Sequence, residues 1–153
     1  MINKRGFTVV EILVVVVILA AVGLIITLGV IPRVEKNAKE NFVDDGKLYL
    51  QAATKYFSDS KISGEDLSNG CISISDLNKS DVGVTDKNSY KGFIKMELLD
   101  DGSVSYNIAI INKKFYSYNS KDKTYIVESS KFSSESVLDK SSDIKDFPSK
   151  CLE

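Results

Sequence analysis

The sequence predicts an α+β protein in which one long amino-terminal helix packs its second half on an antiparallel sheet of three or four strands. Residues 7–31 are almost entirely apolar, and a polar stretch with helical periodicity follows to about residue 58. Short alternating runs separated by turn residues come after it. In a chain of 153 residues these parts correspond to one soluble domain joined to a membrane-length segment.

The apolar segment has the length of a membrane-spanning helix. Residues 12–31 are a run of 20 in which Thr27 is the only polar side chain. At about 1.5 Å per residue, a helix of this length matches a hydrocarbon core about 30 Å thick. The run is longer than the apolar region of a secretory signal peptide, which is about 7–15 residues. Because Lys4 and Arg5 precede it, the amino end is predicted to be cytoplasmic and the bulk of the chain to face outward.

Glu11 is the one carboxylate in this region, and two interpretations of it remain open. A carboxylate inside a membrane segment is costly without a partner, and no basic residue lies in the apolar run. Cleavage after Gly6 would create an ammonium group on Phe7, one helical turn before Glu11 or at the same depth on a neighbouring copy. Alternatively, Glu11 lies at the membrane interface, where a carboxylate at a helix start suits the macrodipole.

The string Lys4-Arg5-Gly6-Phe7-Thr8-Val9-Val10-Glu11, followed by the apolar run, resembles the class III signal of type IV pilins and pseudopilins. Arg5 stands where Lys is common in that family, and Val9 stands where Leu is common. The resemblance implies that a prepilin peptidase cleaves between Gly6 and Phe7 and that the Phe7 amine is N-methylated. It also implies that Glu11 pairs with a neighbouring amino terminus during assembly. The expected parts are a leader at 1–6, a transmembrane and filament-core helix at 7–31, and an extracytoplasmic domain at 32–153.

The polar half of the long helix carries an apolar stripe at spacings of three, four or seven residues, formed by Val34, Ala38, Phe42, Tyr49, Ala52 or Ala53, and Tyr56. Between the two halves, Gly23, Gly29 and Pro32 weaken helical order, so residues 23–32 are the predicted soft part. The resemblance implies that this part bends or loses helical order in a filament. Close packing of helices is a second role for the glycines, compatible with the first.

Five segments are candidate strands of an antiparallel meander, namely residues 71–75, 92–99, 104–112, 115–118 and 123–128. The expected core places the helix stripe against the apolar side chains of these strands, which are Phe93 or Ile94, Met96, Leu98, Ile108, Ile110 and Val127. The tail from residue 129 to residue 153 is rich in serine and is predicted to be a surface segment. A helical spine on an antiparallel sheet resembles the pilin fold.

Cys71 and Cys151 are the only cysteines. An outward-facing domain lies where disulfides persist, and closing a loop of this length removes roughly 4.5 kcal/mol of unfolded-chain entropy. Some pilins tie down their carboxyl end with such a pair, so a disulfide is expected here. Two free thiols are the alternative.

Composition argues against several classes of function. The chain has 20 basic and 21 acidic side chains, interleaved along the soluble part, and no histidine, so we expect no nucleic-acid binding, no metal, no cofactor and no enzyme activity. Residues 100–103 could be part of a calcium loop, although a turn is far commoner for such a sequence. The acid pairs at 44–45 and 100–101 are better interpreted as solvated residues than as a glycosidase pair. Residues 78–80 fit the short glycosylation pattern.

The sequence therefore predicts a structural subunit of a type IV pilus. It is expected to be a single-pass membrane protein before assembly and part of a cell-surface filament afterwards. Its expected partners are further copies in a helical filament, other pilins, the prepilin peptidase, the pilus assembly machinery and the membrane. The alternative close in mechanism is a pseudopilin of a type II secretion or DNA-uptake machine. The alternative from a different class is a signal-anchored surface domain that binds or hydrolyses a ligand, keeps residues 1–6 and leaves Glu11 unpaired.

Overall fold

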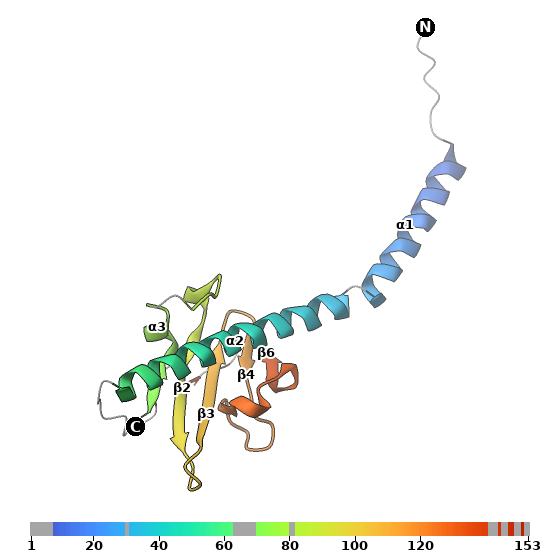
Figure 1. Cartoon of the computed structure of the whole chain (residues 1–153). Coiled ribbons are helices and arrows are strands. Elements are labelled where there is room, and N and C mark those ends of the chain that lie inside the picture. The colour runs from blue at the N-terminus through green and yellow to red at the C-terminus, as the bar shows by residue number, and fades with distance from the viewer. Residues whose placement is uncertain are drawn as a thin grey trace. The chain divides into compact units, whose positions relative to one another are not determined.

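The computed structural model describes residues 8–29, 31–62, 70–79 and 82–140, together with Ile144, Phe147, Pro148 and Cys151. The chain divides into two compact units, Met1–Ala38 and Lys39–Glu153. Helices α1 and α2 come first along the chain, and an antiparallel sheet with short helical segments follows (Figure 1).

Helix α1 covers Val9–Gly29 and helix α2 covers Ile31–Ile62. Position 30, which lies outside the described residues, separates the two helices, and the softening predicted for residues 23–32 stays a prediction. Pro32 is the second residue of α2 and so lies in its first turn, where proline is tolerated. Helix α2 also extends past the predicted end near residue 58.

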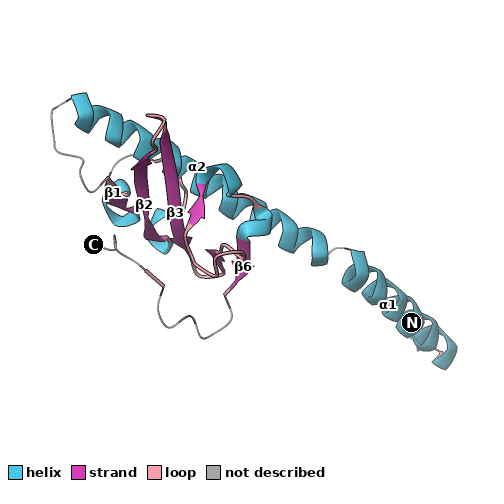
Figure 2. Cartoon of the chain, turned by 90° about the horizontal axis from the view of Figure 1, so that it is seen from below, coloured by secondary structure: helices cyan, strands magenta, loops and turns pink. Residues whose placement is uncertain are grey.

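Within the described residues six strands form one antiparallel sheet, so the predicted α+β class is confirmed while the predicted count of three or four is too low. The strands are β1 Cys71–Ser73, β2 Lys91–Leu98, β3 Val104–Ile111, β4 Phe115–Ser117, β5 Val127–Glu128 and β6 Val137–Asp139. Their order is β1-β2-β3-β4-β6, and β5 also pairs with β3. Strands β2 and β3 form the central hairpin and pair from one end to the other (Figure 2).

The core lies between the part of α2 that begins at Phe42 and one face of the sheet. Ile94 is opposite Ile108, and Ile108 is opposite Val127, so these three buried side chains share a face. Tyr106 lies on the same face, and its ring stacks on the ring of Phe57 from α2 with centroids 6.2 Å apart. The other buried apolar side chains of the helix are Phe42, Val43, Tyr49 and Ala53.

The prediction of the apolar stripe is correct for the middle of α2 and wrong at its two ends. Val34 and Tyr56 are 61% and 46% exposed, and Phe57 takes the buried place because it lies one helical turn after the buried Ala53. Leu98 was also predicted for the core, yet it is 73% exposed, because it lies at the turn end of the hairpin, beyond the ring pair of Phe57 and Tyr106.

Two predicted strands are shorter than expected, for local reasons. The run 71–75 ends as a strand at Ser73, whose hydroxyl accepts a hydrogen bond from the Asp76 N–H at 3.1 Å and caps the short helix α3, Ile74–Leu77. In the run 123–128 only the last two residues form β5. Lys123 has a φ of 53°, and an isolated bridge joins Asn119 to Thr124, so this part is a turn.

The prediction that the tail lies wholly on the surface is wrong for residues 129–139. This segment forms the 3₁₀ helices Ser129–Lys131 and Ser134–Ser136 and then β6. The side chains of Phe132 and Val137 are 5% and 2% exposed. The ring of Phe132 lies against Gly46 of α2, where a Cβ would be 2.4 Å from Phe132 Cε1. A glycine in the middle of the helix is therefore what makes room for this ring.

Candidate functional site

The amino end of α1 is fixed by a reciprocal pair of residues, Thr8 and Glu11. The Thr8 hydroxyl oxygen accepts a hydrogen bond from the Glu11 N–H at 3.3 Å. In return, Glu11 Oε2 accepts hydrogen bonds from the Thr8 N–H at 2.9 Å and from the Thr8 hydroxyl at 3.0 Å. This is a capping box, which satisfies backbone donors that a helix start otherwise leaves unpaired. Within a single chain, the Glu11 carboxylate therefore serves the helix to which it belongs.

The sequence carried a signal for this cap that the motif-based interpretation passed over. Thr8-Val9-Val10-Glu11 fits the pattern of a capping hydroxyl followed three residues later by an acid, just before an apolar run. Gly6 and Phe7, the predicted cleavage and methylation residues, lie outside the described residues. Phe7 is the residue next to Thr8 in the chain, so an amine created there would be covalently adjacent to the capping box.

Helix α1 is apolar around its whole circumference rather than along one stripe. The window Val9–Ile26 is long and apolar enough to cross a membrane, and no part of it is buried inside the chain. Every large apolar side chain from Val9 to Ile26 is at least 47% exposed, for example Val9 at 82% and Ile25 at 70%. A helix of this kind needs lipid or other apolar helices to cover it.

The softening residues occupy ordinary helical positions in this structure. A Cβ added at Gly23 would meet no atom within 4 Å. Gly29 is the last residue of α1, and Pro32 lies in the first turn of α2. Their role in bending stays a prediction.

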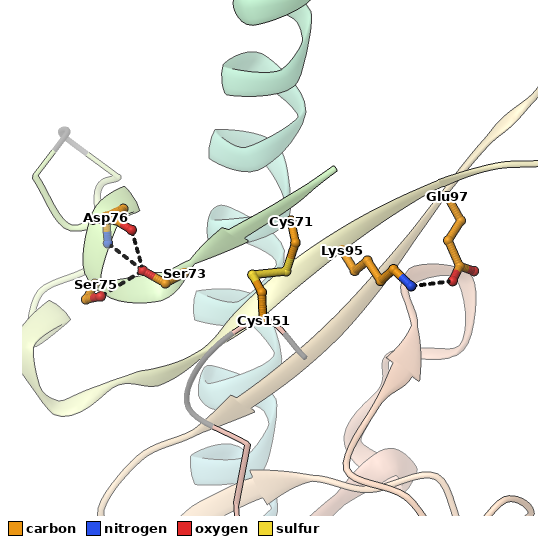
Figure 3. Close-up of a disulfide and its surroundings, with 7 residues drawn as sticks. All are labelled: Cys71, Ser73, Ser75, Asp76, Lys95, Glu97 and Cys151. Carbon is orange, nitrogen blue, oxygen red and sulfur yellow. Dashed lines mark hydrogen bonds and ion pairs between the residues drawn. A yellow bond between two sulfur atoms is a disulfide. The ribbon is translucent and has the colours of Figure 1, made fainter. Parts of the chain in front are cut away.

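Cys71 and Cys151 form the predicted disulfide, with their Cα atoms 6.0 Å apart (Figure 3). Cys71 is the first residue of β1 and lies opposite Lys95 of β2. The bridge therefore joins the carboxyl end of the chain to the first strand of the sheet, across 80 positions of sequence. An ion pair of 3.3 Å between Lys95 and Glu97 lies beside it on β2.

Three of the four carboxylates in the acidic pairs considered above make structural contacts. Asp101 Oδ1 accepts a hydrogen bond from the Ser103 N–H at 2.9 Å, and the Ser103 hydroxyl, together with this N–H, holds the Asp101 pKa below its usual value. Asp44 pairs with Lys47 at 3.5 Å, and Asp45 accepts a hydrogen bond from the Tyr90 hydroxyl at 2.5 Å. No group of three or more metal-ligating side chains occurs among the residues that the structure describes.

Asn78, the acceptor of the glycosylation pattern, is also engaged inside the molecule. Its amide nitrogen donates to the Lys87 carbonyl at 2.8 Å, and its amide oxygen accepts from the Tyr49 hydroxyl at 2.7 Å. Because both ends of the amide are used, this side chain ties α2 to the loop before β2.

Residues 1–27 match the family model of the prokaryotic N-terminal methylation motif. The amino terminus is a prepilin-type signal. No curated protein and no solved structure matches the chain. The prepilin-type signal and the apolar α1 indicate a prepilin of the type IV pilin or pseudopilin kind, with α1 as its membrane anchor. The α+β layout of the remaining residues is consistent with the pilin fold.

Proposed function

We propose that this protein is a structural subunit of a type IV pilus filament. One observation carries the proposal: the prepilin-type signal at residues 1–27 includes an apolar helical window, Val9–Ile26, that the chain leaves uncovered. Lipid covers such a helix before assembly, and the α1 helices of other copies cover it in a filament. Repetition of one heterologous contact without closure gives a fibre.

In this proposal the prepilin peptidase hydrolyses the peptide bond between Gly6 and Phe7 and the new Phe7 amine is methylated. Residues 7–31 then form the filament-core helix, and residues 32–153 form the extracytoplasmic domain. Gly23, Gly29 and Pro32 provide the local weakness through which the core helix adapts to its neighbours.

The proposed role of Glu11 in assembly is to pair with the amino terminus of a neighbouring subunit. The capping box supports this role because it holds the carboxylate at the amino end of α1, next to the position of the new amine. Hydrogen bonds from Thr8 satisfy lone pairs of the carboxylate but leave its charge in place. An ammonium group at the same depth neutralises that charge, and charge is the costly part of a carboxylate in lipid.

The first test is intact-mass and amino-terminal peptide analysis of the protein from cells with an active prepilin peptidase. A chain that starts at methylated Phe7 supports the proposal, and a chain that still starts at Met1 contradicts it. Electron microscopy of the cell surface then separates a pilus, seen as long external fibres, from a pseudopilus.

A second test separates the charge of Glu11 from its capping role. Glu11→Gln keeps an acceptor for the Thr8 donors, since glutamine also completes a capping box, but it removes the charge. We expect this variant to be cleaved normally and to give few or no sheared filaments. The matched variant Thr8→Ala keeps the charge and removes the hydroxyl cap, and we expect it to assemble. Normal filament yield with Glu11→Gln would show that the charge has no part in assembly.

A further inference from the structure

The turn end of the central hairpin exposes apolar side chains, and we call it the hairpin tip: Leu98, Leu99, Asp100, Asp101 and Val104. Leu98 is 73% exposed, Leu99 is 47% exposed, and Val104 is 44% exposed. Leu98 and Val104 lie opposite one another in the β2–β3 pairing. Figure 1 shows this end of the hairpin projecting away from α2. Hairpin turns are normally polar, so leucines here indicate a surface that is covered in the functional state.

Hydrogen bonds within the turn hold the hairpin tip in one conformation. The Leu99 N–H donates to the Ser103 carbonyl and the Gly102 N–H donates to the Leu99 carbonyl, both at 2.9 Å. Gly102 has a φ of 80°, which glycine adopts without strain. Asp101 is used in the turn through its bonds from Ser103. A tip built in this way loses little conformational entropy when it docks.

The opposite end of the same hairpin is basic, and we call it the basic end: Lys91, Lys113, Lys114 and Lys140. All four residues are exposed. Lys91 lies opposite Ile111 at the start of β2, and Lys113 and Lys114 form the turn between β3 and β4. The Lys140 N–H donates to the Lys114 carbonyl at 2.7 Å, which brings the fourth lysine to the same end. The neighbouring carboxylate of Asp139 forms an ion pair with Lys39 at 2.9 Å. Its negative charge is therefore matched by Lys39 and does not neutralise the four lysines of the basic end.

We propose that the hairpin tip of one copy docks on the basic end of a second copy. The carboxylates of the tip complement the lysines in charge, and the lysine stems offer apolar surface that covers the leucines. The two surfaces lie at opposite ends of eight-residue strands, about 24 Å apart. Each contact therefore leaves one free tip and one free basic end, so association continues as an open chain. This inference rests on the proposed filament and names a contact between its extracytoplasmic domains.

Cross-linking in assembled filaments tests the contact directly. The full chain carrying Asp100→Cys and Lys114→Cys is expressed in piliated cells, and sheared filaments are oxidised and run without reductant. We expect a ladder of covalent multimers that reductant collapses. The matched control pairs Asp100→Cys with Lys121→Cys, which lies in the turn between residues 119 and 124, and should give no ladder. Within the part of the chain that the structure describes, none of the three changed side chains makes a hydrogen bond or ion pair that holds the fold.

Charge reversal tests whether complementarity drives the contact. Asp100→Lys with Asp101→Asn makes the tip positive while keeping an oxygen that accepts from Ser103. Lys91→Glu, Lys113→Glu and Lys114→Glu together make the basic end negative. Because like charges then face each other, we expect each set alone to lower the yield of sheared filaments about ten-fold and the two sets combined to restore it. Lys121→Glu should leave the yield unchanged.

The outcomes separate the two proposals. Normal filaments from the unchanged chain, with no ladder and no loss on charge reversal, overturn the docking contact and leave the filament proposal standing. A chain that is cleaved but never found in filaments overturns the filament proposal and the docking contact with it. A ladder together with restoration by the combined reversals supports both.

Discussion

The hydroxyl groups of Tyr49 and Tyr90 join α2 to the segment that leads into the central hairpin. Their rings lie 5.6 Å apart and are almost completely buried. The Tyr49 hydroxyl donates to Asn78 at 2.7 Å, and the Tyr90 hydroxyl donates to Asp45 at 2.5 Å. Loss of solvation, together with the charge of Asp45, raises the pKa of Tyr49 to about 12. Loss of solvation and then the hydrogen bond to Asp45 raise the pKa of Tyr90 well above its usual value.

These tyrosines predict a loss of stability in alkali. A tyrosine in the unfolded chain ionises near pH 10, so in the folded chain both hydroxyls keep a proton that the unfolded chain has lost. Their contribution to the free energy of unfolding is therefore complete below about pH 10 and falls as the pH rises toward 12 and beyond. We expect the stability difference between the unchanged chain and Tyr90→Phe to shrink over this range, measured by urea unfolding of the full chain in detergent. Parallel losses in the two proteins would contradict the assignment.

The contrast between these tyrosine contacts and the amino-terminal motif shows what a sequence can predict about sites. Residues 4–11 are contiguous, so their pattern was readable, and the comparison confirms the prepilin-type signal. The partners Tyr49 with Asn78 and Tyr90 with Asp45 are 29 and 45 positions apart. Their pairing depends on how α2 lies over the sheet, which no local spacing encodes. Asn78 was therefore considered only as a glycan acceptor, although it is a structural hydrogen-bonding residue.

At the scale of elements, helix α2 gives up helical propensity to gain packing. Gly46 lies in its interior, where glycine costs about 1 kcal/mol relative to alanine. The ring of Phe132 fills the space that a side chain at Gly46 would need, and this ring also lies 6.4 Å from the ring of Phe42. The glycine thus secures the segment that follows β5 against the helix.

We expect Gly46→Ala to destabilise the fold despite its better helix propensity. The added Cβ would stand 2.4 Å from Phe132 Cε1, so a buried ring must move, and overpacking of this kind costs about 1–3 kcal/mol. Urea unfolding of the full chain in detergent measures the change. Combining Gly46→Ala with Phe132→Leu should cost less than the two single changes added together, because leucine vacates the space. Strict additivity would show that the ring does not obstruct the new side chain.

The elements that sequence analysis missed are those too short to carry a period. The eight-residue strands β2 and β3 alternate clearly and were predicted within a residue or so of their ends. Strand β6 has three residues, Val137–Asp139, and its pairing with β4 comes only from the tertiary fold. Phe132 is an apolar residue in a serine-rich tail, and its burial depends on the space left by Gly46. Neither signal exists in the tail alone.

At the scale of the whole molecule, the disulfide determines how the carboxyl end is held. Among the described residues beyond Lys140, Cys151 is bonded to Cys71, and the ring of Phe147 lies 5.2 Å from the ring of Tyr125. The bridge reaches β1 at one edge of the sheet, whereas β6 lies at the end of the strand order beyond β4. The segment after β6 is thus tied to both edges of the sheet, by strand pairing at one and by a covalent bond at the other.

Reduction of this bond should therefore lower the free energy of unfolding while the sheet stays folded. In the loop model the bridge, which spans 80 positions, removes roughly 4.5 kcal/mol of unfolded-chain entropy, and disulfides typically deliver about 2–4 kcal/mol. We expect Cys71→Ser with Cys151→Ser to lower the free energy of unfolding by about 2–4 kcal/mol, measured as a lower urea midpoint of the full chain in detergent. Limited proteolysis should then cleave the variant after Lys140 while residues up to β6 stay protected, because Phe132 and Val137 remain in the core. The oxidised chain serves as the control, and reductant should convert its behaviour to that of the variant. An unchanged urea midpoint, or immediate cleavage within β4 and β6, would show that the stabilisation by the disulfide is not confined to the carboxyl end of the chain.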